Sequence, residues 1–278
     1  MPRRFESSPE FQKLLDGGLQ VDLFRVALEI AKDAYPELDS TSYLARLEAL
    51  AERVQQRCGA SPKPRKVISQ INWALFVEEG FQGNRENYFD PRNSYINEVL
   101  DRKVGIPISL SVLYQAIAGR LGIILHGVNL PLHFMLRLDE GDQPWFIDAF
   151  HAGELLDRHG CAQRISEVAR RTIELQEFQI QPCTPGHMVA RMLRNLKTIY
   201  FAVNDFESVL PVQRRLAALA PDDPEELRDL GIICLQLDRP GEAIDPFLFY
   251  LERRSTADDA QLVSELLETA RRRIARWN

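Results

Sequence analysis

Cysteine is scarce in this sequence, and its arrangement excludes two common ways of stabilising a small domain. The 278 residues include 4 cysteines, at positions 58, 161, 183 and 234. They form no C-x-x-C pair and have no neighbouring histidine pattern, so neither a zinc site nor a disulfide framework is expected. We expect reduced thiols in a cytoplasmic protein, with Cys234 in the core.

An excess of basic charge is also missing. The sequence has 34 Lys and Arg against 40 Asp and Glu, a formal net charge of −6. Nucleic acids and anionic membranes both attract basic surfaces, so we expect neither as a partner. Short basic runs at residues 63–66 and 271–273 are typical of solvated surface.

No long apolar run is present either. The most apolar stretch, residues 104–132, is interrupted by Pro107, Gly119, Arg120 and Gly122 and is too broken for a membrane span. The first residues, MPRRFESSPEF, lack the apolar segment of a signal peptide, so we expect none.

What the sequence does have is the composition of a soluble globular protein, with 45% hydrophobic and 27% charged residues. This length fits one large domain or two modest ones. Hydrophobic spacing and turn signals predict helices and then a group of short strands. The predicted helices span residues 8–16, 22–35, 40–58, 67–79, 107–121 and 166–174, with a short helix near Leu155, and the predicted strands span 123–129, 133–138 and 144–150.

His133 and Asp148 lie on the two strands that are predicted to form a hairpin. Between these strands, residues 139–143 read DEGDQ, a turn signal that contains glycine. A two-residue loop at Glu140-Gly141 pairs Asp139 with Asp142, and a four-residue loop about the same centre pairs Leu138 with Gln143. Either register places His133 opposite Asp148, about 5 Å apart on one face. A three-residue loop would shift the register and separate them.

A histidine–carboxylate pair is the arrangement that activates a nucleophile. The carboxylate fixes the imidazole tautomer and leaves the other ring nitrogen facing the nucleophile. A nucleophile is best placed at a helix N-terminus, where the helix dipole favours an anion. The central helix, predicted over residues 107–121, offers such an end.

These residues resemble the transglutaminase-like, or papain-like, core. Members carry Gly-x-Cys at the start of a helix, then a histidine on one strand and an aspartate on the next. His133 and Asp148 match the last two positions, and Gly105 matches the motif glycine. The cysteine position then falls on Pro107, so the nucleophile is missing. Ser109 lies two residues along the helix, which rotates its side chain by about 200° from that position.

A longer resemblance covers most of the chain. The run GNRENYFDPRNSYINEVLDRKVGIPISLSVLYQAIAGRLGI, followed by HGVNLPLHF, resembles the bacterial SirB family, whose core also occurs in an F-box protein of higher eukaryotes. The resemblance implies an α+β protein that is mostly helical. A transglutaminase-like core with a small antiparallel sheet is followed by an α-helical region of tetratricopeptide repeats. The family's core generally looks catalytically incomplete.

Polar and aromatic residues gather in the segment 80–102. Capping and loop hydrogen bonds explain each of them taken singly, and Asp90 before Pro91 is a typical helix start. The resemblance implies instead that the whole segment lines the cleft beside His133. The predicted cleft-lining residues are Asn84, Tyr88, Asp90, Asn93, Tyr95 and Pro107.

A 34-residue period, which is typical of tetratricopeptide repeats, begins at Ala190 and recurs at Pro224. In the second repeat, Gly231, Ala243 and Phe247 fit the pattern. Residues 257–277 are predicted to form one long capping helix. We expect a domain of residues 1–182 with the helical N-terminal region and the core, and a repeat domain of residues 183–278.

These features favour a non-catalytic protein that binds a protein or peptide partner through the repeat region, Ala190 to Trp277. This hypothesis rests on the absence of a cysteine near Gly105 and on the repeats. No feature indicates a cofactor, and none is expected. The sequence does not indicate an oligomeric state.

Three other interpretations stay open. Ser109 or Ser111 could act as the nucleophile with His133 and Asp148, giving an amide or ester hydrolase or an acyl transferase. His133, Asp148 and His151 could hold zinc with an open position, although nothing in the spacing requires it and we expect no metal. The histidine–aspartate pair could also be a buried structural hydrogen bond.

Overall fold

The computed structural model describes residues 5–59, 62–141 and 143–277, and the chain divides between Met192 and Leu193 into two compact units. We call them the core unit and the repeat unit, and each is described by itself. The predicted boundary between residues 182 and 183 lies just before helix α8 (Pro185–Ala202), within which the division falls. None of the described helices is long and apolar enough to span a membrane.

The core unit begins with helices whose ends follow ordinary capping rules. Asp22 and Asp39 accept hydrogen bonds from the first free backbone N–H groups of their helices, and proline stands at the start of two others. The helices are α1 (Pro9–Leu15), α2 (Leu23–Ala34), α3 (Ser40–Cys58), α4 (Pro64–Asn72) and α5 (Ile96–Arg102). The helix predicted over residues 67–79 therefore starts earlier, and it continues after α4 as a π-helical turn, Trp73–Glu78.

Helix α6 (Pro107–Arg120) is the centre of the core unit, as nearly all of its faces are apolar. It packs on α2, α3, α4 and α5 and on one face of the sheet. Pro107 stands at its first position, where the missing N–H costs no helical hydrogen bond. A short parallel pair, β1 (Gln82–Gly83) and β2 (Val104–Gly105), precedes it and was not predicted.

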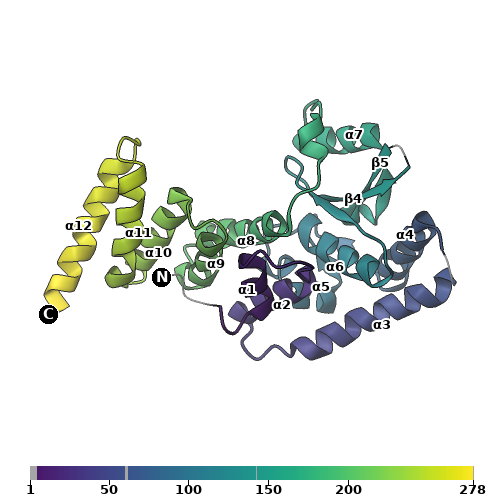
Figure 1. The fold of residues 1–278 in the computed structure, drawn as a ribbon, viewed down its shortest axis with the longest axis horizontal. Helices are drawn as coiled ribbons and strands as arrows, with labels where there is room; N and C mark the ends of the chain where they lie inside the picture. The colour runs from purple at the N-terminus through teal and green to yellow at the C-terminus, as the bar shows by residue number, and fades with distance from the viewer. Residues whose placement is uncertain (1–4, 60–61, 142, 278) are drawn as a thin grey trace. The chain divides into compact units, whose positions relative to one another are not determined.

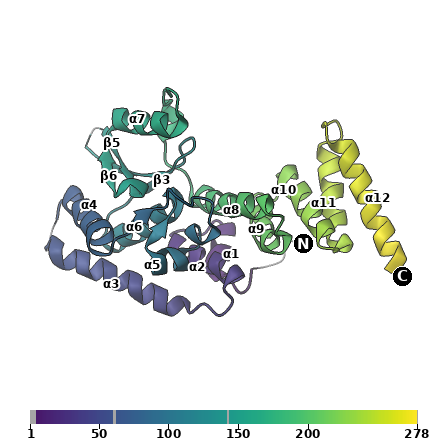
Figure 2. The same ribbon diagram turned by 180° about the vertical axis from the view of Figure 1, so that it is seen from behind.

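The antiparallel sheet has four strands in the order β3-β4-β5-β6. Its strands are β3 (His126–Val128), β4 (Met135–Glu140), β5 (Gln143–Asp148) and β6 (Glu154–Leu156). The sheet lies between α6 and α7 (Arg158–Ala169) in both views (Figures 1 and 2). Leu136 and Ile147 belong to the cluster around α6, whereas Met135 and Phe146 pack with Cys161 of α7. The alternation follows from the two-residue period of a strand.

Two predictions about the end of the core unit are wrong. The segment near Leu155 forms β6 and not a helix, because it pairs with the free edge of β5 through Ile147 and Leu155. The helix predicted over residues 166–174 begins earlier, as α7, where Asp157 caps it by accepting from the Gly160 N–H at 2.7 Å. A short 3₁₀ helix, Glu177–Ile180, follows α7.

In the repeat unit, the later part of α8 is followed by α9 (Phe206–Leu219), α10 (Pro224–Gln236), α11 (Pro240–Arg253) and α12 (Ala260–Trp277). Helices α9 and α11 begin at residues 206 and 240, and 240 − 206 gives the predicted period of 34. Phe247 lies against Gly231, where a Cβ atom would be 2.6 Å from its ring, so this position requires glycine. The sequence prediction of an α+β chain with helical repeats at its C-terminal end is confirmed.

Candidate functional site

His133 and Asp148 are in direct contact in the core unit. His133 lies in the turn before β4 and Asp148 ends β5, and His133 Nε2 is 2.9 Å from Asp148 Oδ1. Both side chains are buried, with exposed fractions of 2% for the histidine and 0% for the aspartate.

The expected register of the hairpin is wrong, although the faces are as expected. Leu138 pairs with Trp145 and not with Gln143, and Asp139 pairs with Pro144. The observed register is therefore displaced by two residues from the expected one. Asp142, the partner expected for Asp139, lies outside the described residues. Since side chains alternate with a period of two, an even displacement leaves His133 and Asp148 on the same face.

Asp148 accepts hydrogen bonds from four donors. Its Oδ1 accepts from His133 Nε2 and from the His151 backbone N–H at 3.3 Å, and its Oδ2 accepts from His151 Nδ1 at 2.7 Å and from Arg164 Nη1 at 2.6 Å. Burial alone would raise the pKa of Asp148, but the hydrogen bonds from the two imidazoles hold that pKa well below its ordinary value. Asp148 is therefore an ionised and fully satisfied carboxylate.

The carboxylate also fixes the tautomers of both imidazoles. It can only accept, so the ring nitrogens that face it, Nε2 of His133 and Nδ1 of His151, are donors. This leaves Nδ1 of His133 without a hydrogen-bond partner among the residues that the structure describes. That nitrogen is the one that a relay would direct toward a nucleophile.

The backbone on both sides of this cluster is held in uncommon conformations. Leu132, directly before His133, has φ +60°, and Ala152, directly after His151, has φ +56°. Left-handed backbone costs a non-glycine residue about 1–2 kcal/mol, so surrounding contacts must impose it. One such contact is the hydrogen bond from Asn72 Nδ2 to the Gly153 carbonyl at 2.8 Å.

The two serines near the motif position are not placed as nucleophiles. Ser109 Oγ donates to the Asn93 carbonyl at 2.6 Å and accepts from the Ile106 N–H at 3.0 Å, so it caps the start of α6. Ser111 is fully buried, and its Oγ has no hydrogen-bond partner among the described residues. No hydrogen bond joins either hydroxyl to His133 in the part of the chain that the structure describes.

Three of the predicted cleft-lining residues, Asn84, Asp90 and Asn93, hold a turn together through their side-chain hydrogen bonds. Asn84 Nδ2 donates to Asn93 Oδ1 at 3.1 Å, and Asn93 Nδ2 donates to the carbonyls of Asn87 and Tyr88. Asp90 accepts from the Arg92 backbone N–H at 2.9 Å. These contacts are the local ones that capping and loop bonding predict.

Of that group, Tyr88 is the residue linked to the histidine through ring contacts. Its ring centroid is 6.3 Å from that of Phe150, which is 6.2 Å from that of His133. Tyr95 is buried with its ring edge-on to Tyr35, and Pro107 is buried at the start of α6.

Within the described residues, no hydrogen bond joins a cysteine thiol to His133. The Cys161 thiol contacts Met135 Sδ at 3.7 Å in the cluster between the sheet and α7. Burial, together with the charge of Asp148, raises the pKa of Cys161 to about 12, so the thiol stays protonated at neutral pH. Burial likewise raises the pKa of Cys183 to about 11.

The three groups that could hold a metal ion, His133, Asp148 and His151, have ligand atoms within 4.8 Å of one another. Their geometry fits a hydrogen-bond cluster better than a coordination site. The nitrogens nearest Asp148 already donate to it, and the Arg164 guanidinium supplies the positive charge that a cation would supply. Arg164 was not predicted, because nothing in the local sequence of α7 distinguishes it from a surface arginine.

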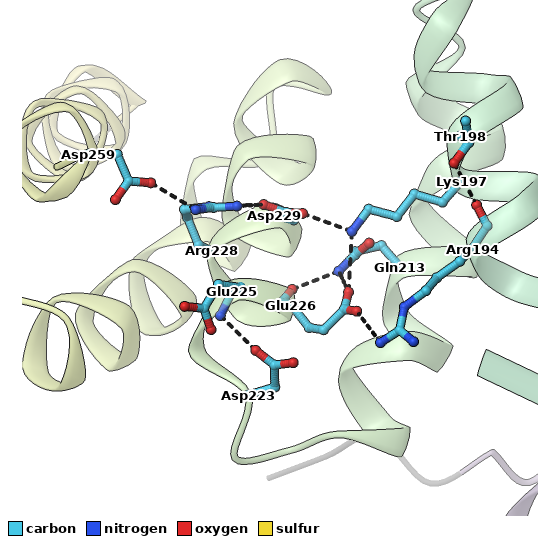
Figure 3. Close-up of polar contacts among 10 residues, drawn as sticks. All are labelled: Arg194, Lys197, Thr198, Gln213, Asp223, Glu225, Glu226, Arg228, Asp229 and Asp259. Atoms are coloured by element: carbon cyan, nitrogen blue, oxygen red, sulfur yellow. Dashed lines mark hydrogen bonds and ion pairs between the residues drawn. The ribbon is translucent and has the colours of Figure 1, made fainter. Parts of the chain in front are cut away.

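The repeat unit contains a second buried carboxylate, on α10 (Figure 3). Glu226 has an exposed fraction of 7% and accepts from Gln213 Nε2 at 2.9 Å and from Lys197 Nζ and Arg194 Nη2, each at 3.2 Å. Lys197 also donates to Asp229 at 2.8 Å. The polar contacts then continue through Arg228 to Asp259, beside the start of α12.

The position of this network explains why the first repeat lacks the usual small and aromatic residues. With the 34-residue period, Lys197 corresponds to Gly231 and Gln213 to Phe247. The apolar contact of the second repeat is thus replaced in the first by a hydrogen-bonded network around Glu226. The sequence period could have revealed this exchange, because both polar residues occupy positions that are apolar or small in the next repeat.

Comparisons with known proteins agree with these two units. A model described as the transglutaminase-like superfamily matches residues 41–194, and a model described as tetratricopeptide repeat matches residues 196–268. A UPF0162 protein of Xylella fastidiosa (strain 9a5c) is 32% identical over 256 residues, which are 91% of this chain and 91% of that protein. F-box only protein 21 of Homo sapiens is 38% identical over 110 residues, 37% of this chain and 18% of that protein.

Among solved structures, a crystal structure of menin is similar with a TM-score of 0.42 and 11% sequence identity, over 88% of this chain and 69% of that chain. A likeness at this level carries no argument about function.

Proposed function

We propose, because the chain belongs to the UPF0162 family of transglutaminase-like proteins with tetratricopeptide repeats, that it is a non-catalytic adaptor or regulator that binds a protein or peptide. Tetratricopeptide repeats generally mediate protein–protein interactions, and this proposal assigns that task to residues from Ala190 to Trp277. We further propose that the protein is bacterial and cytoplasmic and belongs to the group named SirB.

The observation that carries this proposal is the proline at the nucleophile position. Pro107 stands at the start of α6, where the family resemblance places a cysteine, and a pyrrolidine ring cannot attack a carbonyl carbon. The hydroxyl of Ser109 is already bonded to two backbone groups, and Asp148 is bonded to four donors. The imidazole and its acidic partner are therefore retained without a group to activate.

Chemical labelling tests the absence of catalysis. Neither a fluorophosphonate probe nor an acyl donor is expected to label the protein, and His133→Ala should give the same blank result. Labelling of Ser109 that disappears in His133→Ala would replace this proposal with the hydrolase or acyl-transferase alternative.

A restored thiol tests the assignment of the nucleophile position. In Pro107→Cys we expect a thiol that reacts with iodoacetamide at about pH 6.5 at least tenfold faster than in Pro107→Cys with His133→Ala, since a paired thiolate has a lowered pKa. Equal rates in the two variants would mean that residue 107 does not face the imidazole.

Site-specific photocrosslinking tests the binding role. A benzoyl-phenylalanine at Leu248 or Leu262, exposed positions in the repeat unit, should capture one defined protein in cells. The same group at Leu19, which is 86% exposed in the core unit, is the matched control. The same background at all three positions would contradict binding through the repeats.

A further inference from the structure

A cavity in the core unit has a composition that the adaptor function does not explain. Its volume is about 480 Å³, and it lies between the turn that leads into β4 and the beginning of α8. Its lining includes Asn129, Leu130, Pro131, Phe178, His187 and Arg191. In Figure 2 the beginning of α8 lies beside β3, and the Cys183 N–H donates to the Gly127 carbonyl at 2.8 Å, which fixes this part of the cavity wall.

The cavity has positive but no negative groups in its lining. Two of its side chains, those of Arg191 and His187, are basic, and its other polar side chains belong to asparagine, glutamine and cysteine. The chain has 40 acidic residues and a net charge of −6, but no carboxylate lines this cavity beside Arg191. The nearby Glu177 already binds Arg158 and Gln181.

Arg191 has no acidic partner in the described part of the chain. Its one hydrogen bond is a long contact of 3.4 Å from Nη1 to Asn129 Oδ1. A guanidinium has five N–H donors in a planar fork that matches a carboxylate, so most of its donor capacity is free. The nearby N-terminal end of α8 adds positive potential on the same side.

Apolar side chains stand next to this cation. Phe178, which lines the same cavity as Arg191, is 75% exposed. Leu130 and Pro131 line the cavity itself. A ligand that satisfies both features carries a carboxylate directly beside an apolar side chain.

We infer that this cavity binds a peptide segment of a partner through a carboxylate at Arg191 and an adjacent apolar side chain against Phe178. This site belongs to the core unit, and its Arg191 stands at the very start of the region from Ala190 to Trp277. The binding that we propose for the repeat unit is tested at Leu248 and Leu262, which do not line this cavity. Either one can fail without the other. Its position also relates it to His133, because Pro131 lines the cavity two positions before that residue.

The electrostatics around Tyr88 agree with this position. Burial raises the pKa of Tyr88, and the charge of Arg191 opposes that increase, so the guanidinium lies within electrostatic range of the phenol. Tyr88 contacts Phe150, and Phe150 contacts His133.

The test uses the full chain and a library of random heptapeptides displayed with free C-termini. Panning should enrich sequences with a carboxylate, either the C-terminal one or an acidic side chain, next to an apolar residue. Fluorescence polarisation with an enriched peptide, its C-terminal amide and free acetate then identifies which source supplies the carboxylate. Loss of binding on amidation identifies the C-terminus, and retained binding identifies an acidic side chain.

Three variants test whether the enriched peptide binds in this cavity. Arg191→Gln should weaken binding about 10- to 100-fold, as expected for a lost charge-assisted hydrogen bond. Asn129→Asp should abolish binding, because it places a carboxylate beside the guanidinium. Arg25→Gln, which removes the same charge from an exposed ion pair on α2, should leave binding unchanged.

Several outcomes would overturn the inference. They are an absence of any enriched sequence, equal binding by wild type and Arg191→Gln, or displacement of the peptide by acetate at millimolar concentration with no contribution from the apolar residue. Thermal melting curves of each variant serve as the folding control. Arg191 has no ion pair to lose, so its replacement should not change the melting temperature.

Discussion

Asp148 in the core unit and Glu226 in the repeat unit are buried carboxylates that each accept from several donors, but the donors differ in their chemistry. Asp148 in the core unit is bound by two imidazoles and a guanidinium, and it is completely buried. Glu226 in the repeat unit is bound by an ammonium, a guanidinium and an amide, and its surroundings open toward solvent along Lys197 and Arg194.

The two hydrogen-bond networks, around Asp148 and around Glu226, differ in what they do for the protein. The network around Glu226 replaces a glycine and an aromatic residue in the packing of a repeat, so its task is structural. The network around Asp148 orients two imidazoles and leaves Nδ1 of His133 without a hydrogen-bond partner among the described residues, an arrangement that fits the nucleophile-free relay of our proposal. A buried carboxylate with several donors is thus not by itself a sign of catalysis.

The largest expected effect is the removal of the core carboxylate. Asp148→Ala removes the acceptor that both imidazoles and Arg164 share, although Arg164 keeps its contact with Glu154, and this should lower the free energy of unfolding by about 3–5 kcal/mol. Hydrogen exchange read by mass spectrometry on peptides of β4, β5 and α7 measures this loss. As a control, Asp139→Ala removes a half-exposed carboxylate of the same hairpin and should cost under about 1 kcal/mol. If Asp148→Ala also lowered the free energy of unfolding by under about 1 kcal/mol, the hydrogen bonds to Asp148 would not stabilise the core unit jointly.

The second effect concerns the carboxylate in the repeats. Glu226→Ala should cost about 3 kcal/mol, because Lys197, Arg194 and Gln213 lose their shared acceptor. Replacing the whole network with apolar residues, Lys197→Ala with Gln213→Phe and Glu226→Leu, should restore most of that loss, since the second repeat already packs in this manner. The rates of hydrogen exchange in peptides of α9 and α10 measure the stability of each variant. No recovery in the triple variant would show that the polar network is essential to this repeat.

The third effect is a dependence of stability on pH in the core unit, where the pKa of Asp148 is lowered. The pKa of Asp148 is lowered in the folded state, whereas an unfolded aspartate has a pKa of about 3.9. The stabilisation is therefore complete above about pH 4 and is lost as the pH falls below that value toward the folded-state pKa. Denaturation curves between about pH 5 and pH 3 should show this decline in wild type and a weaker decline in Asp148→Asn. The same slope in both proteins would assign the acid sensitivity to other carboxylates.

The smallest effect is a dependence on salt in the repeat unit. Its charged groups are partly exposed, so raising NaCl from about 0.05 M to about 1 M should weaken the Glu226 network by under about 1 kcal/mol. The triple apolar variant should not respond, and neither should the peptides around Asp148. An equal response in the variant would mean that the salt acts elsewhere on the protein.

The hairpin shows which structural features the two-residue period of a strand predicts and which it does not. Alternation placed His133 and Asp148 on one face and survived an error in register, because the displacement was by two residues. The strand β6 was missed, because three residues carry no period of their own and become a strand only when the edge of β5 is available. Arg164 was missed for a similar reason, since it lies far from Asp148 in the sequence and on another element.

The sequence by itself determined the two-part organisation, the 34-residue repeat, the central apolar helix and the absence of a cysteine at its start, because these depend on local composition and spacing. Only the tertiary structure decided which donors share Asp148, that Ser109 is bonded to Asn93 and Ile106, and that Arg191 faces a cavity without an acid. These facts depend on contacts between residues that are distant in the chain. The free energy of such contacts comes from burial and hydrogen-bond geometry, which exist only once the chain has folded.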